Sequence, residues 1–233
     1  MRNLNKFFFS IIFMSFITFI AANENVYEYK IRFKIKNVIS LDGIKELTKK
    51  DKDAYHVIFV GKNRMLNAEL NQEAEFKYIN SKVFPKYYSQ KIKVPLRGAL
   101  KQTINYDFKN TKITSTGDVN WVIDFLGEST PLDPLSSGFQ IRENVKNGLT
   151  NFDINLIKLD EGIIYKNSYS VVGEEVLEIK DTKYPCIVLE RINNDRKTLY
   201  YVAKTLDFIL IKVSDDRKER RLSIEAEKVL GFG

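Results

Sequence analysis

The feature that most constrains the fold is a strict alternation of apolar and charged residues over residues 27–36. A period of two places alternate side chains on opposite faces of a β-strand, whereas a helix repeats every 3.6 residues. Strands of this kind bury one face and leave the other in water, which favours antiparallel pairing. The alternation returns at residues 106–108, 119–126 and 222–226.

Turn residues at short spacing, such as those at 61–63, divide the chain into further strands. They predict a meander of hairpins from Phe152 to the C-terminus. The expected strands lie near residues 152–159, 163–172, 175–180, 184–192, 197–203, 207–214 and 221–229. The solid apolar run at 208–211 fits a strand buried on both faces. Residues 41–53 fit a short helix or a hairpin arm, and we favour the hairpin.

Residues 134–147 are flanked by the start and stop signals of an amphipathic helix. Asp133 is suited to the N-cap, Pro134 to the first helical position, and Gly148 lies just beyond the end. One face of this helix is apolar and can pack across an antiparallel sheet. The side chains that share this face are Leu135, Phe139 and Val145.

The composition predicts one domain stabilised by its core. The chain has 233 residues, of which 44% are apolar and 29% charged, and only 11 glycines and 5 prolines are present for linkers. A single cysteine excludes a disulfide within the chain. We therefore expect residues 23–233 to form one β-rich domain.

The first 22 residues predict export to the periplasm. Arg2 and Lys6 precede an apolar run from Phe7 to Ile20, and Ala22 is the expected cleavage site. The run is shorter than the roughly 20 residues that span a bilayer. We therefore expect no stable transmembrane segment after cleavage, and no lipoprotein, because the junction has no cysteine.

The mature domain is only mildly basic, since cleavage lowers the formal net charge from +7 to +5. Its densest basic cluster, residues 217–221, fits a solvated hairpin turn or a contact with an anionic envelope partner. No nucleic-acid-binding pattern is present, and we expect no nucleic-acid partner.

The second half resembles the bacterial domain-of-unknown-function family 3108. The resemblance rests on the start of the predicted helix, an arginine within it, and two strand motifs. These residues are Asp133-Pro134-Leu135-Ser136, Arg142, the stretch from Tyr169 to Glu175, and Tyr201-Val202-Ala203, with Pro85 to Tyr88 as a further element. Tyr201 and Leu210 depart from the family pattern, which has Trp and Pro there.

The resemblance implies a mainly β fold in an exported protein of a Gram-negative cell. Its antiparallel meander would curl into a half-barrel like that of periplasmic lipoprotein carriers, with one or two short helices packed on it. No activity is implied, because the family is uncharacterised. Asp133, Ser136, Arg142, Gly173 and Glu175 carry over as signature positions.

Few residues could support catalysis or bind a metal. His56 is the only histidine and Cys186 the only cysteine of the sequence. This excludes a structural zinc site with four nitrogen and sulfur ligands from one chain. A Cys/His dyad stays arithmetically possible, but a buried, unreactive Cys186 is the simpler interpretation. No nucleophile elbow, phosphate-binding loop or dinucleotide fingerprint is present, so we expect no catalytic residue, metal or cofactor.

Arg142 and the aromatic residues are the candidates for a binding site. Arg142 shares the helix face that meets the sheet, so it should pair with a carboxylate such as Glu175 or with strand carbonyls, or contact a ligand headgroup. Aromatic side chains that include Tyr88 and Trp121 could line a concavity of the curved sheet.

We therefore predict a noncatalytic periplasmic binding or carrier protein. Its ligand would be an apolar or amphipathic envelope molecule, such as a lipid or an acylated chain. The alternative is an assembly factor whose sheet edge or helix face binds another cell-envelope protein. A cavity lined by the aromatic residues around Trp121 favours the carrier, and a filled core with a long exposed edge favours the assembly factor.

Overall fold

The structure is a computed structural model that describes residues 27–36, 40–96, 98–126, 130–193, 196–215 and 222–233. The expected signal peptide and the basic cluster at 217–221 lie outside these ranges. The helical elements are α1 (Pro134–Lys146) and the single-turn η1 (Lys204–Leu206). The strands are β1 (Tyr27–Lys36), β2 (Leu41–Lys49), β3 (Ala54–Asn63), β4 (Ala68–Ile79), β5 (Lys82–Lys93), β6 (Ala99–Asp107), β7 (Lys112–Gly117), β8 (Trp121–Asp124), β9 (Asn151–Lys158), β10 (Ile163–Ile179), β11 (Thr182–Asn193), β12 (Arg196–Ala203), β13 (Ile209–Asp215) and β14 (Leu222–Phe232).

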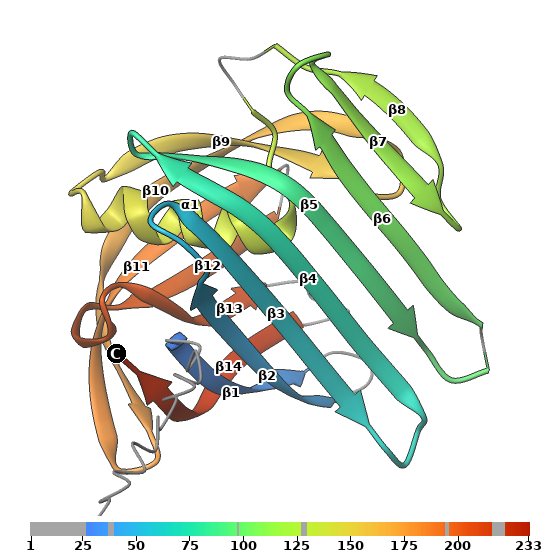
Figure 1. Cartoon of the computed structure of the whole chain (residues 1–233). Coiled ribbons are helices and arrows are strands. Elements are labelled where there is room, and N and C mark those ends of the chain that lie inside the picture. The colour runs from blue at the N-terminus through green and yellow to red at the C-terminus, as the bar shows by residue number, and fades with distance from the viewer. Residues whose placement is uncertain (1–26, 37–39, 97, 127–129, 194–195, 216–221) are drawn as a thin grey trace, which may run out of the picture.

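All these strands form one 14-stranded sheet in which neighbouring strands are antiparallel (Figure 1). The chain starts in the middle of the sheet at β1 and builds outward to the edge strand β8. Helix α1 then leads to the opposite edge, β9, from which the strands build back until β14 pairs with β1. The expectation of a mainly β, antiparallel meander with a short helix is confirmed.

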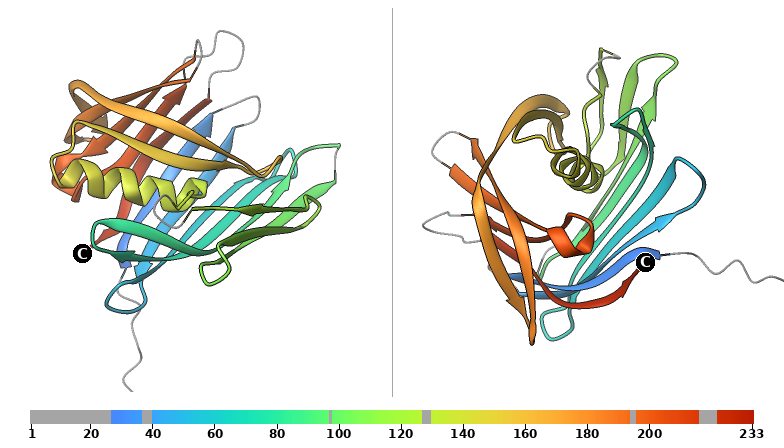
Figure 2. Two further views of the ribbon diagram at one scale, coloured as in Figure 1. Left: turned by 90° about the horizontal axis from the view of Figure 1, so that it is seen from above. Right: turned by 90° about the vertical axis from the view of Figure 1, so that its left-hand side faces the viewer.

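The sheet curls strongly, and α1 lies in the opening between its two edges. Figure 2 shows the helix between β5 on one side and β9 and β10 on the other, with the sheet wrapped around below it. The contacts of α1 with β4, β5, β9 and β13 agree with this placement. The topology explains the position, because the connection from one edge to the other has to cross the opening.

Strand β1 shows why the sheet has an apolar inner face. Ile31 and Phe33 are 0% and 3% exposed, as the alternation predicts. On the outer face the Nζ atom of Lys30 lies 2.9 Å from a carboxylate oxygen of Glu46 on β2. The charged residues of the alternation therefore remain near water, while the apolar ones supply the core.

The two ends of α1 follow the predicted signals. The side chain of Asp133 accepts hydrogen bonds from the backbone N–H groups of Leu135 (2.8 Å) and Ser136 (3.0 Å), which satisfies two free donors of the first turn. Gly148, just past the end, has a φ of +80°, a conformation that favours glycine.

Phe139 packs α1 onto the sheet. Its ring centroid lies 4.9 Å from the rings of Tyr55 on β3 and Phe76 on β4, and 5.4 Å from that of Tyr78. Aromatic pairs contribute about 0.5–1.5 kcal/mol each beyond the burial of their area. This cluster therefore fixes the helix against the strands on one side of the opening.

Several expected boundaries were wrong. Residues 163–172 and 175–180 form the single strand β10, because a β-bulge between Val171 and Gly173 takes up one residue without ending the pairing. Strand β3 continues through the turn expected at 61–63. The strand expected at 119–126 is confined to β8, which has four residues.

Candidate functional site

Arg142 is the most strongly connected of the signature residues. It is 6% exposed, and its Nε donates a hydrogen bond to the backbone carbonyl of Asp207 at 2.9 Å. Nη2 donates to the carboxylate of the same residue, and Nη1 donates to Glu28 on β1 at 3.3 Å. The guanidinium also lies 5.5 Å from the ring centroid of Phe139. Arg142 therefore ties α1 to the start of β13 and to β1.

The electrostatics of Asp207 agree with this structural role. Partial burial by itself raises the pKa of Asp207, but hydrogen bonds from Lys146 and Arg142 outweigh that effect and hold the pKa below its usual value. The Lys146 Nζ atom lies 2.8 Å from the Asp207 carboxylate. The backbone of Asp207 is left-handed, with a φ of 49°, and this turns both its carbonyl and its side chain toward α1.

The expected partner Glu175 does not meet Arg142. Glu175 is exposed on β10, opposite Cys186 of β11. Gly173, which follows the β-bulge, is also exposed, and a Cβ atom added there would meet nothing within 4 Å. Neither of these two signature residues therefore contacts Arg142. Asp207 and Glu28 are its partners in place of Glu175.

Asp133 and Ser136 form the buried start of α1. Both are 0% exposed, and the Ser136 hydroxyl donates to a carboxylate oxygen of Asp133 at 2.6 Å. Complete burial raises the pKa of Asp133, against the opposing effect of the hydrogen bonds from Ser136 and the helix N–H groups. All of these contacts join residues of the first turn of α1. The Asp-x-x-Ser motif therefore acts as an N-cap.

Tyr88 belongs to a chain of buried hydrogen bonds on the inner face of β4 to β7. Gln72 donates to the Tyr88 hydroxyl at 2.9 Å, which donates to Gln90 at 3.1 Å, and Gln90 donates to Gln102 at 2.8 Å. Gln102 in turn donates to the backbone carbonyl of Leu159, between β9 and β10. This chain links the two sides of the sheet.

Trp121 closes the opening at the same place. Its Nε1 donates to the carbonyl of Leu159 at 2.9 Å, and its ring lies so close to Gly162 that an added Cβ would be 2.7 Å from ring atoms. Backbone hydrogen bonds from Leu132 to β9 cover part of the other edge. Trp121 therefore holds the two edges of the sheet together.

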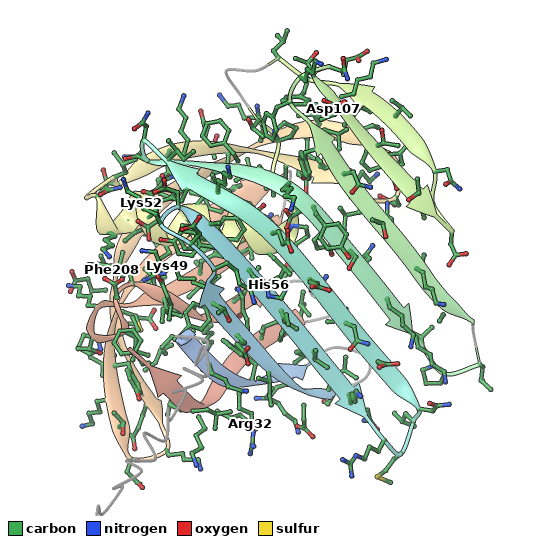
Figure 3. The ribbon with its side chains drawn as sticks, viewed as in Figure 1. Arg32, Lys49, Lys52, His56, Asp107 and Phe208 are labelled. Atoms are coloured by element: carbon green, nitrogen blue, oxygen red, sulfur yellow. The ribbon has the colours of Figure 1, made fainter. Side chains whose placement is uncertain are left out.

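His56 and Cys186 do not form a dyad. His56 lies on β3 (Figure 3), with its Nε2 2.7 Å from a carboxylate oxygen of Glu73. Cys186 lies on β11, and five strands separate β3 from β11 in the sheet. Cys186 is fully buried, as expected, and burial raises the pKa of its thiol to about 11. Its low reactivity stays a prediction.

The described residues enclose a cavity of about 290 Å³ between α1 and the inner face of the sheet. Helix α1 contributes one wall, and strands from both halves of the sheet contribute the rest. Most of the lining is apolar or aromatic, and it includes Phe33, Phe59, Leu135, Ile141, Leu156 and Tyr200. Neither Trp121 nor Tyr88 lines it, so this cavity is not the concavity predicted around Trp121.

Three cations also line this cavity: Lys45, Arg191 and Lys212. None of the three was singled out in the sequence. The signal for Lys45 was present, because it occupies an apolar position in the alternation of β2 between Gly43 and Leu47. Arg191 follows the apolar run 186–189 and Glu190. No pattern in the sequence indicated that its side chain faces the cavity.

A second hollow, of about 770 Å³, is a weaker candidate. It lies on the outer face of the sheet, and Arg32, Lys62 and Met65 are among the residues around it. Five of its ten lining residues are charged, whereas sites for small molecules are typically lined by mainly apolar side chains with few polar groups. The cavity under α1 is therefore the candidate site.

No described helix is both long enough and apolar enough to cross a membrane. Within the same ranges, no group of three or more His, Cys, Asp or Glu side chains is arranged to hold a metal ion.

Comparison with known proteins supports the fold. No family model matches the chain, so membership of family 3108 stays a prediction, and no curated protein matches it. One similar solved structure is described as a β-barrel-like protein of domain of unknown function DUF1849 from Brucella abortus. The two share 7% sequence identity at a TM-score of 0.55, over 88% of this chain and 98% of the other. At this identity the likeness shows the fold alone, and this chain is β-barrel-like.

Proposed function

We propose that this protein binds or carries an apolar or amphipathic molecule with an alkyl or acyl chain, without catalysing a reaction. The observation that carries the proposal is the cavity between α1 and the sheet. Its position is the one that an open, curled sheet offers, because the helix covers the concave face without filling it.

The size and the lining of the cavity support this class of ligand. Protein interiors are packed so closely that few voids exceed the size of a water molecule. Apolar cavities of about 150 Å³ already bind guests of the size of benzene. At about 290 Å³ this cavity is at the lower end of the range for ligand sites, which suits a medium-length alkyl chain.

Export completes the proposal. With the expected signal peptide removed after Ala22, the domain would meet its ligand in the periplasm, where lipids and acylated envelope molecules are the available amphiphiles.

The alternative, an assembly factor that binds an envelope protein through an exposed edge, has less support. Strand β8 offers an edge of only four residues, and short edges are a common protection against pairing with other chains. At the other edge Leu132 already occupies backbone groups of β9. The geometry therefore favours the carrier.

The test is displacement of the neutral fluorescent probe N-phenyl-1-naphthylamine by decanol. Gly138 lies on α1 and lines the cavity, and an added Cβ there meets only the Lys45 Nζ atom, at 3.5 Å. In Gly138→Leu the new side chain should occupy the cavity and weaken decanol binding at least about tenfold, equivalent to about 1.4 kcal/mol. The helix should not weaken, because leucine is favoured over glycine by up to about 1 kcal/mol within a helix.

Gly98→Leu is the matched control, since a Cβ at Gly98 meets nothing within 4 Å and the residue does not line the cavity. It should bind decanol as the wild type does. Failure of the wild type to bind the probe or decanol would contradict the proposal, and so would unchanged binding by Gly138→Leu.

A further inference from the structure

We propose that the cavity selects an acidic amphiphile, in which one negatively charged head group is attached to the alkyl chain. This inference rests on the proposed function and specifies the ligand of the same site. The shared chemistry is an alkyl carboxylate or an alkyl phosphate. The observation behind it is that the lining contains three cationic side chains and no acidic one.

Lys45 occupies an apolar row of the inner face. Its direct neighbours in the sheet are Ile31 on β1 and Phe59 on β3, which are 0% and 6% exposed. Its Nζ atom approaches α1, where it would lie 3.5 Å from a Cβ placed on Gly138. Within the described part of the chain, Lys45 makes no ion pair or hydrogen bond through its side chain.

Arg191 lies on the opposite half of the sheet, in a row with Tyr169 on β10 and Thr198 on β12. Both neighbours are buried. Its Nη2 donates to the Thr198 hydroxyl at 3.2 Å, and the guanidinium lies 5.7 Å from the ring centroid of Tyr200. Its buried Nε has no hydrogen-bond partner. Among the described residues Arg191 forms no ion pair.

Lys212 provides the internal contrast. It lines the same cavity, but its Nζ atom lies 3.0 Å from a carboxylate oxygen of Glu225, so its charge is already compensated. Among the residues that the structure describes, no carboxylate pairs with Lys45 or Arg191. Two uncompensated cations therefore face a largely apolar cavity.

Removing a cation partly from water costs free energy unless an anion or hydrogen-bond acceptors compensate it. An acidic head group would supply both, and its hydrogen bonds to Lys45 or Arg191 would be charge-assisted. An uncharged head group of the same size would leave these cations uncompensated while losing its own water. The cavity should therefore bind an acid more tightly than the corresponding alcohol.

The experiment compares decanoate, decyl phosphate and decanol as competitors of N-phenyl-1-naphthylamine, at concentrations below micelle formation. The proteins are wild type, Lys45→Met, Arg191→Met, the double variant, and Lys86→Met as the control, because Lys86 is a paired cation that does not line the cavity. The wild type should bind at least one of the two acids about tenfold or more tightly than decanol, and the double variant should lose this preference. Lys86→Met should keep it.

The outcomes separate the two proposals. If decanol and the acids bind the wild type equally, or if the double variant keeps the preference for acid, the inference fails while the alkyl-binding function stands. If none of the three displaces the probe, the proposed function fails as well. The ratio between decanoate and decyl phosphate identifies the kind of head group. Thermal melts accompany each variant, and Lys45→Gln and Arg191→Gln replace any variant that does not fold.

Discussion

At the scale of single residues, the buried guanidinium of Arg142 is stable because three acceptors surround it. Asp207 supplies a carbonyl and a carboxylate, and Glu28 supplies a second carboxylate. An arginine cannot lose its proton to escape burial, so these acceptors are necessary for the fold. Besides Arg142, Lys146 also forms an ion pair with Asp207.

Arg142→Ala should therefore lower the free energy of unfolding by about 3–5 kcal/mol, because it leaves the acceptors without their partner in a partly buried place. Arg142→Lys should restore only part of the loss, since an ammonium cannot reproduce the forked geometry. Denaturant melts of both variants measure this. Equal stability of wild type and Arg142→Ala would contradict the role of Arg142 as a structural tie.

The pH dependence of stability gives a separate test of the same contact. A carboxyl group whose pKa is lowered in the folded state stabilises the fold at pH values above its usual pKa, and this contribution is lost as the pH falls through the lowered value. Asp207 has such a lowered pKa. Its usual value is 3.8.

Asp207→Asn should therefore be less stable than wild type at neutral pH by about 1.5–3 kcal/mol, the contribution of hydrogen bonds to charged groups. The difference should shrink as the pH falls from the usual pKa of 3.8 through the lowered value, because the wild-type carboxyl is then protonated. Asparagine tolerates the left-handed backbone at this position, so the substitution isolates the charge. Denaturant melts across the range measure the difference, and a constant gap would contradict the assignment.

The sequence predicted side-chain contacts only where the two residues lie close together along the chain. Asp133 could be assigned as the N-cap because it directly precedes Pro134, and Ser136, which contacts it, lies only three residues further on. Arg142 could be assigned to the face of α1 that meets the sheet, but Asp207 could not be named as its partner. That pairing depends on how β12, η1 and β13 return to the helix, which no local pattern encodes.

At the scale of elements, the two edges of the sheet are held together by the contact between β8 and the turn before β10. Gly162 has a φ of +69°, and its missing side chain makes room for the ring of Trp121. Gly148 has a similar φ of +80°, but no atom lies within 4 Å of a Cβ built there. The two glycines therefore differ mainly in the close approach of Trp121.

Gly162→Ala should cost more stability than Gly148→Ala, because both substitutions carry the backbone strain of a positive φ and only the first also displaces the ring. The strain alone is on the order of 1–2 kcal/mol. Combining Gly162→Ala with Trp121→Ala should remove the excess, as a double-mutant cycle will show. Equal costs for the two single substitutions would mean that the Trp121 contact does not stabilise the closed edges.

The type of each element was largely predictable, and the boundaries less so. The alternation in β1 and the cap and stop signals of α1 are local, and both were confirmed. The break expected between residues 172 and 175 was wrong, because a β-bulge between Val171 and Gly173 lets the long antiparallel pair of β10 and β11 continue.

At the scale of the whole molecule, the proposed function depends on the curl of the sheet. The chain builds two series of strands that meet at β1 and β14, and α1 crosses the opening that remains. Lys45 and Arg191, on β2 and β11, line the same cavity only because of this curl. The meander could be predicted from alternation and turns, but the identity of the lining residues depends on contacts between distant strands.

The central claim is that an alkyl chain occupies the cavity under α1. The most direct measurement is a set of intermolecular nuclear Overhauser effects between decanoate and the methyl groups of the wild-type protein. We expect contacts from the decanoate methylenes to Leu135, Ile141 and Leu156, which line the cavity. Contacts confined to exposed methyl groups, such as those of Val122 and Val176, would contradict the claim, and so would the absence of any contact.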